Sequence, residues 1–599
     1  MHDIQSSTLE HGFERFLNDT SATWHVVRLA ALVCLCLLVY SNAFHRGFCY
    51  DDYHHIVENE SLRDLRNVQH FFGEPSTAST FGARSAMYRP LLLSTFALNF
   101  TLFGEGALSF HITNVFIHCI TVAAVYLLAH MLAKRALVAF LAAAVFAIHP
   151  VNAEAVNYVS ARSSALCSVW YILGFACFLK AHGARSRRAV CLWVAASASA
   201  YALSVCTKEL ALSFPLVVAF AELLLCRENK EGFVKTVGKY HLAIWLVTAA
   251  FIGLRFTLFA QYGPFAVGGG GYFVRGVWEN VLTQSKAIVF YIFLFLFPFG
   301  LNVDHHIAVA YSLVEPAVLA SLAVILGVVG AAVYYRRKRP LVAFAIAWYL
   351  ITLVPTSSVH PLNVILNEHR LYLPSIGFCL FVGIVLAGIA PKLAVYWPGE
   401  RRSPTFNHVA VALLLTILLG VLTHQRNYVW RNELVLWEDA ARKSPRKYRT
   451  HAELGDAYLR GGEYRKGATA YQRALELNPY HLLTDAPEKV KALWTEEEIA
   501  RINPKNTLAE SYHGGLHNNL GVAYSHLGRF AEALSEYEAA VSFAPLFVQA
   551  RINLAKAYVR QGRPDDARSQ LDEALRLDPS NNTARELLEE LSPDGSHSP

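Results

Sequence analysis

Residues 315–335 read EPAVLASLAVILGVVGAAVYY, a stretch with a charged side chain only at its first position. A helix of this length and apolar composition is long enough to cross the roughly 30 Å hydrocarbon core of a bilayer. Similar runs, such as LAALVCLCLLVYSNAF at 29–44 and VALLLTILLGVL at 411–422, crowd the first two thirds of the chain, whereas the last third is polar. The sequence therefore predicts an all-α protein, in which a polytopic membrane helix bundle is followed by a water-soluble part.

The composition agrees with this division. Of 599 residues, 54% are hydrophobic and 17% are charged, and the mean hydropathy of +0.30 is too high for an ordinary soluble protein. The net charge of +7 is modest and much of the basic excess lies in short loops between apolar runs, which argues against a nucleic-acid partner. Most of the ten cysteines lie within apolar runs and form no CxxC pair, so neither disulfides nor zinc are expected.

Twelve segments are candidate membrane helices. They lie at 26–44, 108–132, 137–150, 163–181, 189–206, 210–226, 241–260, 280–300, 313–335, 341–358, 371–390 and 406–424. Basic loops such as 185–188 and 336–339 are expected in the cytoplasm with the N-terminus. Three segments lie between the basic loops that end at Lys239 and begin at Arg336, where parity requires an even number of crossings. We therefore expect 280–300 to be a re-entrant or broken helix, which leaves about eleven crossings and a C-terminal domain outside.

Two more stretches fall on the predicted outer side. YRPLLLSTFALNFTLFG at 88–104 is short for a span and is expected to lie in the membrane interface as an amphipathic helix. GPFAVGGGGYF at 263–273 lacks the lysine and the flanking strand and helix of a phosphate-binding loop, so we expect a flexible loop.

The polar last third contains an internal repeat. LGDAY at 454–458, LGVAY at 520–524 and LAKAY at 554–558 recur, the last two 34 residues apart, and a degenerate copy is expected at 482–516. Each copy continues with a small, a bulky and a small residue and then proline, at the spacing of tetratricopeptide repeats. These residues are Gly467, Tyr471, Ala474 and Pro479, then Ala533, Tyr537, Ala540 and Pro545, then Ala567, Leu571, Ala574 and Pro579. Such arrays usually bind polypeptides; the alternative is that they only stabilise the membrane part.

These features predict the domain organisation of the chain. The expected parts are a cytoplasmic segment 1–23, a transmembrane domain 24–425 with an outer loop 45–107, a linker 426–447, a repeat domain 448–591 and a disordered tail 592–599.

The outer loop carries an acidic pair in the stretch FCYDDYHHIVENE, residues 48–60. Asp51 and Asp52 lie at the membrane surface, where charge is unusual and often functional. One of two adjacent carboxylates can act as a general base while its neighbour orients a hydroxyl or a metal ion. An ordinary solvated turn accounts for the spacing equally well.

Three other charged clusters fall on the same predicted side, in HPVNAEAVNYVSAR at 149–162, TKEL at 207–210 and NEHRLYLPS at 367–375. Basic side chains gathered with carboxylates suit a phosphate-bearing lipid headgroup. The residues predicted to bind it are Arg89, His149, Glu154, Arg162, Lys208, Glu209, Arg255, Glu368, His369 and Arg370. The alternatives are a structural ion pair for Lys208 and Glu209 and snorkelling for Arg255.

The order of these elements is recognisable as a whole. FCYDDYHHIVEN, YRPLLLSTFALN, FHITNVFIH, HPVNAEAV, KELALSFP and NEHRLYLPSIGF, followed by tetratricopeptide repeats, resemble the transmembrane and tetratricopeptide-repeat-containing O-mannosyltransferases and, more broadly, the polytopic glycosyltransferases of the C fold. The resemblance implies transfer of mannose from a polyprenyl phosphate to serine or threonine hydroxyls of a protein, on the outer or lumenal face. It places the acidic pair on Asp51 and Asp52, one of them the base. Nothing in the sequence resembles a DxD metal motif, so no cofactor and no metal are expected, although a carboxylate pair near phosphate is compatible with a divalent ion.

Other functions remain open at this point. A non-catalytic membrane scaffold that recruits a partner through the repeats would not need the acidic pair, and a transporter is disfavoured because no duplicated half is visible. The expected partners are a polyprenyl-phosphate sugar, an acceptor polypeptide and the bilayer, without nucleic acid. A bacterial inner membrane is favoured over the endoplasmic reticulum.

Overall fold

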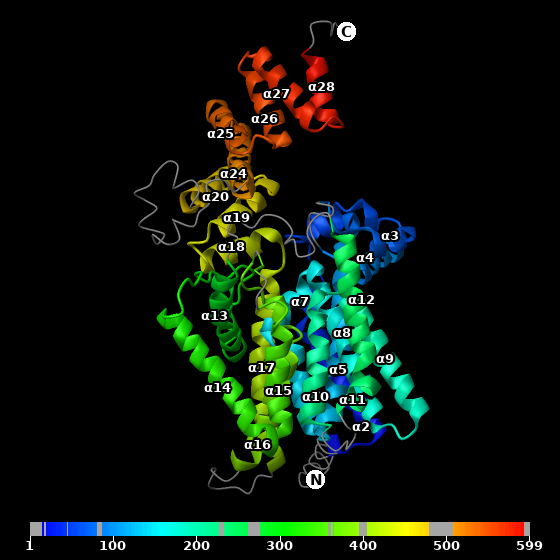
Figure 1. Cartoon of the computed structure of the whole chain (residues 1–599). Helices are drawn as coiled ribbons and strands as arrows, with labels where there is room; N and C mark the ends of the chain where they lie inside the picture. The colour runs from blue at the N-terminus through cyan, green and yellow to red at the C-terminus, as the bar shows by residue number, and fades with distance from the viewer. Residues whose placement is uncertain are drawn as a thin grey trace. The chain divides into compact units, whose positions relative to one another are not determined.

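All regular secondary structure in the described part of the computed structural model is helical, and Figure 1 shows the helices in chain order. The described residues are 15–16, 19–44, 46–80, 87–226, 233–260, 276–357, 361–362, 364–393, 404–478 and 507–591. They form two compact units. Unit 1 comprises the described residues up to Val303 and those of Ile307–Asn432, and unit 2 comprises Asp304–His306 and the described residues from Glu433 onward.

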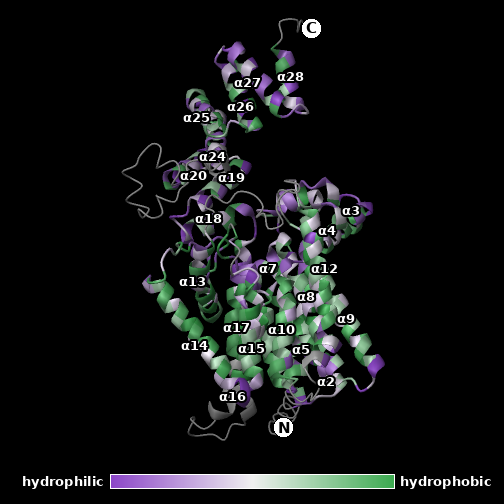
Figure 2. Ribbon diagram, in the orientation of Figure 1, coloured by the Kyte–Doolittle hydropathy of each residue, from purple (hydrophilic) through white to green (hydrophobic). Residues whose placement is uncertain are grey.

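Unit 1 contains the apolar helices. Seven stretches among the described residues are long and apolar enough to cross a membrane, or eight if one bent pair is a single span. They are α2 (Ala22–Val39), α5 (Ala107–Ala133), Val159–Gly183 with α8 (Arg162–Gly183), α9 (Arg187–Val205), Val237–Leu258 with α12 (Leu242–Leu258), α13 (Val277–Leu296) and α14 (Pro316–Lys338). The bent pair is α6 (Ala136–Ile148) with Pro150–Asn157, which includes α7 (Ala153–Asn157). Figure 2 shows apolar residues along the length of α5, α14 and α15, so the chain is a multi-pass membrane protein.

Each of the twelve predicted segments contains a helix. The remaining ones are shorter or partly outside the described residues: α10 (Phe214–Leu224), α15 (Pro340–Leu353), α16 (Ser375–Leu393) and α17 (Pro404–Val429). The structure contains no membrane, so the expected eleven crossings remain a prediction.

The predicted broken helix at 280–300 is wrong in one respect, because α13 is continuous from Val277 to Leu296. The break lies instead after α6, where Pro150 removes a backbone donor and the pair bends by 54°. Side chains take over the freed carbonyls: Asn152 donates to the carbonyl of Phe146 at 2.8 Å, and Thr423 donates to that of Ile148. Irregular backbone is tolerated within a membrane domain when other protein groups form hydrogen bonds with its free carbonyls.

Small residues allow close packing around this break. A Cβ added to Gly383 of α16 would lie 2.7 Å from the carbonyl oxygen of Val138 on α6, and one on Gly377 would lie 2.5 Å from that of Ala345 on α15. Helix pairs in membranes commonly approach through such glycines. They hold α16 against both neighbours.

The outer loop folds on a small apolar core of its own. Ile56, Leu62 and Phe71 pack against Phe96 and Phe100. These residues come from short turns, from α3 (Val68–Gly73) and from α4 (Pro90–Phe103), the helix predicted to lie in the interface. Leu98, Leu102 and Phe103 of α4 remain exposed, which suits that location.

Unit 2 begins with α18 (Glu433–Lys443), which lies within the predicted linker 426–447. Lys447 donates to the Asp304 carboxylate at 2.6 Å, and the Ser444 hydroxyl donates to the Asp304 carbonyl at 3.0 Å. These bonds place Asp304–His306 with the repeat unit.

The repeats form pairs of helices. They are α19 (Tyr448–Arg460) with α20 (Tyr464–Leu477), α24 (Thr507–His526) with α25 (Phe530–Phe543), and α26 (Val548–Arg560) with α27 (Pro564–Leu577), followed by α28 (Asn582–Glu590). Most of the expected degenerate repeat at 482–516, the glycine-rich stretch at 263–273 and the tail 592–599 lie outside the described residues.

The bulky position of each repeat fills a gap that the first helix leaves open. A Cβ on Gly455 would lie 2.8 Å from the ring of Tyr471, and one on Gly521 would lie 2.7 Å from that of Tyr537. In the last pair Ala555 replaces the glycine and buried Leu571 replaces the tyrosine. A larger residue on the first helix is thus accompanied by a smaller one on the second.

We predict that Gly521→Ala lowers the stability of unit 2 by about 1–3 kcal/mol, because the tyrosine ring must move. Adding Tyr537→Leu, which copies the last pair, should recover most of this loss. Thermal unfolding of the full chain in detergent measures both variants. A double variant no more stable than Gly521→Ala would contradict this account of the packing.

Candidate functional site

The acidic pair lies in a strained turn of the outer loop. Tyr50 has a φ of 57°, a left-handed conformation that a bulky residue rarely adopts, and the π-helix η2 (Tyr53–Val57) follows the pair. Strained backbone of this kind persists where surrounding contacts hold it, and it concentrates at functional sites. The turn directs the two carboxylates into different surroundings.

Asp52 is buried and holds the loop in place. Its carboxylate accepts hydrogen bonds from the Cys49 amide at 3.1 Å, and from the Ser160 amide and hydroxyl at 2.7 and 2.6 Å. Burial raises the pKa of Asp52 to about 7, although these donors oppose the shift. The side chain thus joins the outer loop to the turn before α8.

Asp51 is the more accessible of the pair, with a third of its side chain exposed. Its carboxylate lies 3.3 Å from Nε2 of His54. Burial alone would raise the pKa of Asp51, but the hydrogen bond from His54, together with smaller contributions that include a bond from Tyr158, lowers it. Asp51 is therefore ionised at neutral pH and open to a reactant, as a general base must be.

Tyr158 connects this loop to the second predicted cluster. Its ring stacks on Trp430 at 5.5 Å between centroids, and it lies 6.0 Å from the ring of Tyr50 and 6.4 Å from that of His369. The sequence analysis did not single out Tyr158. The only available signal was its position within the HPVNAEAVNYVSAR element.

Glu154 and the 368–370 segment form one buried charged network. His369 Nδ1 lies 2.5 Å from a Glu154 oxygen, and the other oxygen accepts the Glu368 amide at 3.1 Å. Glu368 in turn pairs with Arg426 at 3.3 Å. The sequence analysis missed Arg426, which follows the apolar run of the last predicted span.

The third cluster gathers the cations. Glu209 lies 3.3 Å from Arg89 and 3.7 Å from Arg255, so its carboxylate holds two guanidinium groups together. Lys208 is buried and donates to the Ser164 hydroxyl at 2.7 Å. Burial, reinforced by the charge of Arg89, lowers the pKa of Lys208 to about 7.

Electrostatic interactions show that the three clusters are neighbours. The pKa of His369 is held well below its usual range by burial and then by the charges of Lys208, Arg370 and Arg89. Burial lowers the pKa of His55 to about 3, and Arg89 contributes there too. Arg89 therefore acts on both the acidic loop and the Glu154 network. That these residues converge on one phosphate-binding site remains a prediction.

Two predicted ligands of the headgroup face inward instead. Arg162 is fully buried and donates to the side-chain oxygens of Asn114 and Asn99, both at 2.7 Å, and to the Phe110 carbonyl at 3.1 Å. His149 is buried too, stacks on Phe295, and uses both ring nitrogens in bonds to backbone groups. Both serve as internal braces, so we do not carry them into the proposed site.

The acidic loop also contains atoms that could hold a metal ion. Ligand atoms of Asp51, His54 and His55 lie within 4.8 Å of one another. Two imidazoles and a carboxylate suit a divalent transition metal. The prediction of a metal-free site therefore remains untested.

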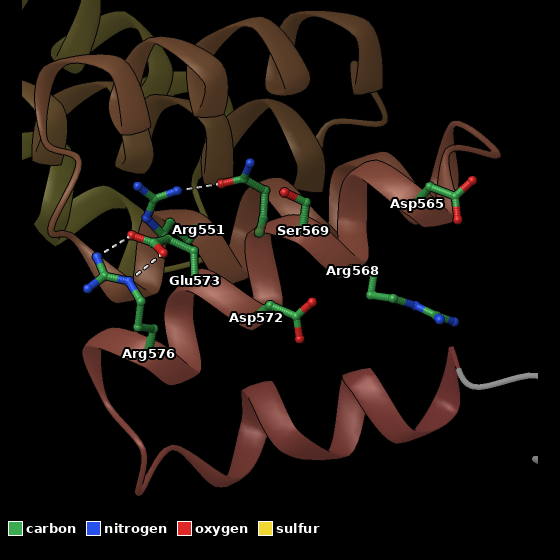
Figure 3. Close-up of a pocket in the computed structure, with 8 residues that line it drawn as sticks. Arg551, Asp565, Arg568, Ser569, Asp572, Glu573 and Arg576 are labelled. Atoms are coloured by element: carbon green, nitrogen blue, oxygen red, sulfur yellow. Dashed lines mark hydrogen bonds and ion pairs between the residues drawn. The ribbon is translucent and has the colours of Figure 1, made fainter.

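Unit 2 presents a separate hollow, of about 600 Å³, on the last repeat. Figure 3 shows its lining, in which Arg576 pairs with Glu573 while Asp572 and Arg568 lie along the same helix. The mixture of both charges suits a polar polypeptide more than an apolar ligand.

Comparisons with known proteins agree with the repeat pattern. Family models described as tetratricopeptide repeat match residues 448–481 and 526–591. Among solved structures, the chain is similar to the first TPR of Spaghetti (RPAP3) bound to HSP90 peptide SRMEEVD, at 21% identity over 24% of this chain and 90% of that one, with a TM-score of 0.18. It is likewise similar to the Arabidopsis OM64 TPR domain, at 19% identity over 24% and 93%, with a TM-score of 0.18.

Similarity to curated proteins extends across both units. The chain is 22% identical to "Protein O-mannosyl-transferase Tmtc3" of Drosophila melanogaster over 94% of its length and 69% of the relative, and 22% identical to "Protein O-mannosyl-transferase TMTC3" of Homo sapiens over 94% and 65%. The chain is related to these proteins. A third match is "Protein O-mannosyl-transferase F38B6.6" of Caenorhabditis elegans, at 22% identity over 80% of this chain and 66% of the relative. The predicted resemblance is thus confirmed, and the chain spans about two thirds of the length of these relatives.

We predict that Arg162→Met markedly lowers the thermal stability of the full chain in detergent. Each buried acceptor that loses its donor costs about 1–3 kcal/mol, and Arg162 serves several. Arg185→Met, at an exposed basic position, is the control and should change little. If Arg162→Met kept wild-type stability, the bracing role would be excluded and a place in a binding site would be restored.

Proposed function

We propose that this chain is a membrane glycosyltransferase of the C-fold type that transfers mannose from a polyprenyl phosphate to serine or threonine hydroxyls of a protein. The mannosyl group and the protein acceptor are suggested by the names of the relatives. The observation that carries the proposal is the position of Asp51, an accessible carboxylate with a lowered pKa in the same loop as His55, on which the charge of Arg89 acts.

Asp51 is the general base of the proposed reaction. Its carboxylate removes the proton from the acceptor hydroxyl as the hydroxyl oxygen attacks the anomeric carbon of the sugar. The bond between that carbon and the phosphate oxygen breaks, and the lipid phosphate leaves with the electron pair. Since a phosphate leaving group is already anionic, this step needs cations and no general acid.

Arg89, Lys208 and Arg370 supply those cations. The charges of all three lower the pKa of His369, and Arg255 approaches the same Glu209 carboxylate as Arg89. Arginine can bind phosphate oxygens in a bidentate manner, which orients the donor. Lys208 loses its charge as the pH rises through about 7, but a bound phosphate would favour the protonated form.

Asp52 positions the base in this scheme. It holds the turn against Ser160, so that the neighbouring Asp51 points away from the buried bonds. In this scheme Asp51 therefore reacts with the acceptor hydroxyl and Asp52 positions Asp51.

The repeats are proposed to present the acceptor polypeptide, with the polar hollow on α27 as one contact surface (Figure 3). The basic loops favour an active face on the outer or lumenal side of the membrane, and a bacterial inner membrane is favoured over the endoplasmic reticulum.

The test is transfer of radiolabelled mannose from polyprenyl phosphate mannose to protein, in membranes that contain the wild type or a variant. Asp51→Asn should reduce transfer by at least about 100-fold at unchanged protein level, because a general base contributes about 10²–10⁴-fold. Asp52→Asn should reduce both transfer and thermal stability, since an amide cannot accept all three hydrogen bonds.

Asp64→Asn is the matched control, because Asp64 is an acid of the same loop that pairs only with nearby Arg66 in the structure. It should retain wild-type transfer. Equal transfer by Asp51→Asn and Asp64→Asn would exclude Asp51 as the base. Absence of transfer by the wild type with this donor would favour a different sugar or a non-catalytic scaffold.

A further inference from the structure

A second group of metal-ligating side chains lies at the other end of α8 from the candidate site. α8 begins at Arg162, next to the Ser160 that holds Asp52, and ends at Gly183, about 30 Å away for a helix of this length. At this far end the ligand atoms of His182, Glu222 and Cys226 all lie within 4.8 Å of one another. Outside the acidic loop, this is the only such group among the described residues.

A second histidine approaches the same carboxylate. Nε2 of His182 lies 2.7 Å, and Nε2 of His241 3.8 Å, from the same Glu222 oxygen. The side chains of His182, Glu222 and His241 are 7%, 20% and 6% exposed, so the group is largely enclosed. Two nitrogens, one oxygen and one sulfur are thus presented from three segments of the chain.

The rings are fixed in these orientations by their neighbours. Tyr240 stacks on His182 at 3.9 Å between centroids, and Phe178 meets His182 edge-on at 4.8 Å. His241 is the last residue of the π-helix η10 (Val237–His241). Single π-helical turns inside helices are rare and occur frequently at functional sites. Here the π-helical turn ends at His241, the fourth side chain of the group.

We propose that His182, Glu222, Cys226 and His241 form a structural zinc site. Zinc takes histidine nitrogen, cysteine sulfur and carboxylate oxygen in tetrahedral sites closed by four protein ligands. A thiolate and a carboxylate together balance the charge of Zn²⁺. Ligands at zinc bonding distance stand about 3.3–3.7 Å apart, so the Glu222 carboxylate has only to rotate away from His182.

This site differs from the expectation that the cysteines are inert. Cys226 is the last residue of the predicted segment 210–226, and its partners are 4 to 44 residues away in sequence, so no local spacing pattern marks them. The metal would join the ends of α8 and α10 to the start of α12, on the side predicted to face the cytoplasm. The proposal does not depend on the proposed transferase activity.

The test measures metal on the full chain, purified in detergent with an affinity tag that contains no histidine. After loading with zinc and removal of the excess, elemental analysis should give one tightly held zinc per wild-type chain. Cys226→Ser and His182→Gln should each bind zinc at least about tenfold more weakly in competition with a chromophoric chelator. Cys191→Ser, which removes an exposed cysteine of α9, should bind as the wild type does.

The absorption spectrum of bound cobalt tests the site in the wild-type chain itself. Wild-type chain loaded with Co²⁺ should show a thiolate-to-cobalt charge-transfer band, together with the visible bands of tetrahedral cobalt. Zinc should displace both sets of bands. A wild type without the thiolate band, or with no more zinc than the His182→Gln/Cys226→Ser double variant, would leave only an ion pair between Glu222 and the histidines and overturn the proposal.

Discussion

Burial of charge at membrane depth is the constraint on which this structure depends. Glu154 and Glu368 are almost fully buried, and each would be costly there without a partner. Arg426 at the end of α17 pairs with Glu368, while Glu154 binds His369 and the Glu368 amide. This network therefore links the bent α6–α7 pair, the turn before α16 and α17. Removing Arg426 would take away the guanidinium group that pairs with the buried Glu368 carboxylate.

The same network places the groups that the proposed reaction needs. The bend at Pro150 frees Glu154 to face His369, and the turn that follows brings Tyr158 against Trp430 and Ser160 against Asp52. The hydrogen bonds from Ser160 to Asp52 thus help to hold the acidic loop against the bundle. In this arrangement the ring of Tyr158 lies 6.4 Å from that of His369 and 6.0 Å from that of Tyr50, the residue before Asp51.

Much of the fold could be predicted because lipid and repeats leave strong patterns in sequence. Runs such as 315–335 need no tertiary information to be identified as helices, and the Gly521 and Tyr537 positions follow from repeat spacing alone. The break after α6 was misplaced to 280–300, since a polar start such as Gln284 and Lys286 resembles an interruption when only composition is considered. The hydrogen bonds from the Asn152 and Thr423 side chains to backbone carbonyls of α6 cannot be inferred from one sequence.

The sequence indicates which residues belong to the candidate site more readily than it indicates what each of them does. Charge at the ends of apolar runs identified Glu154, Lys208 and His369, whereas Arg162 carries the same signal and turns out to be an internal brace. Sequence position could not separate Asp51 from Asp52 either, because the difference lies in the bonds from Cys49 and Ser160. Arg426 and Tyr158 were missed because their partners come from distant parts of the chain.

The proposed reaction requires one phosphate-binding site between the acidic loop and the cations. The most direct measurement is photolabelling of the full chain in membranes with a polyprenyl phosphate that carries a photoreactive group next to the phosphate, followed by mass spectrometry of the labelled peptides. The account predicts label on the segments around Arg89, Lys208 and Arg370, lost when unmodified polyprenyl phosphate is added in excess. Label confined to other segments, or label that the competitor does not reduce, would contradict it.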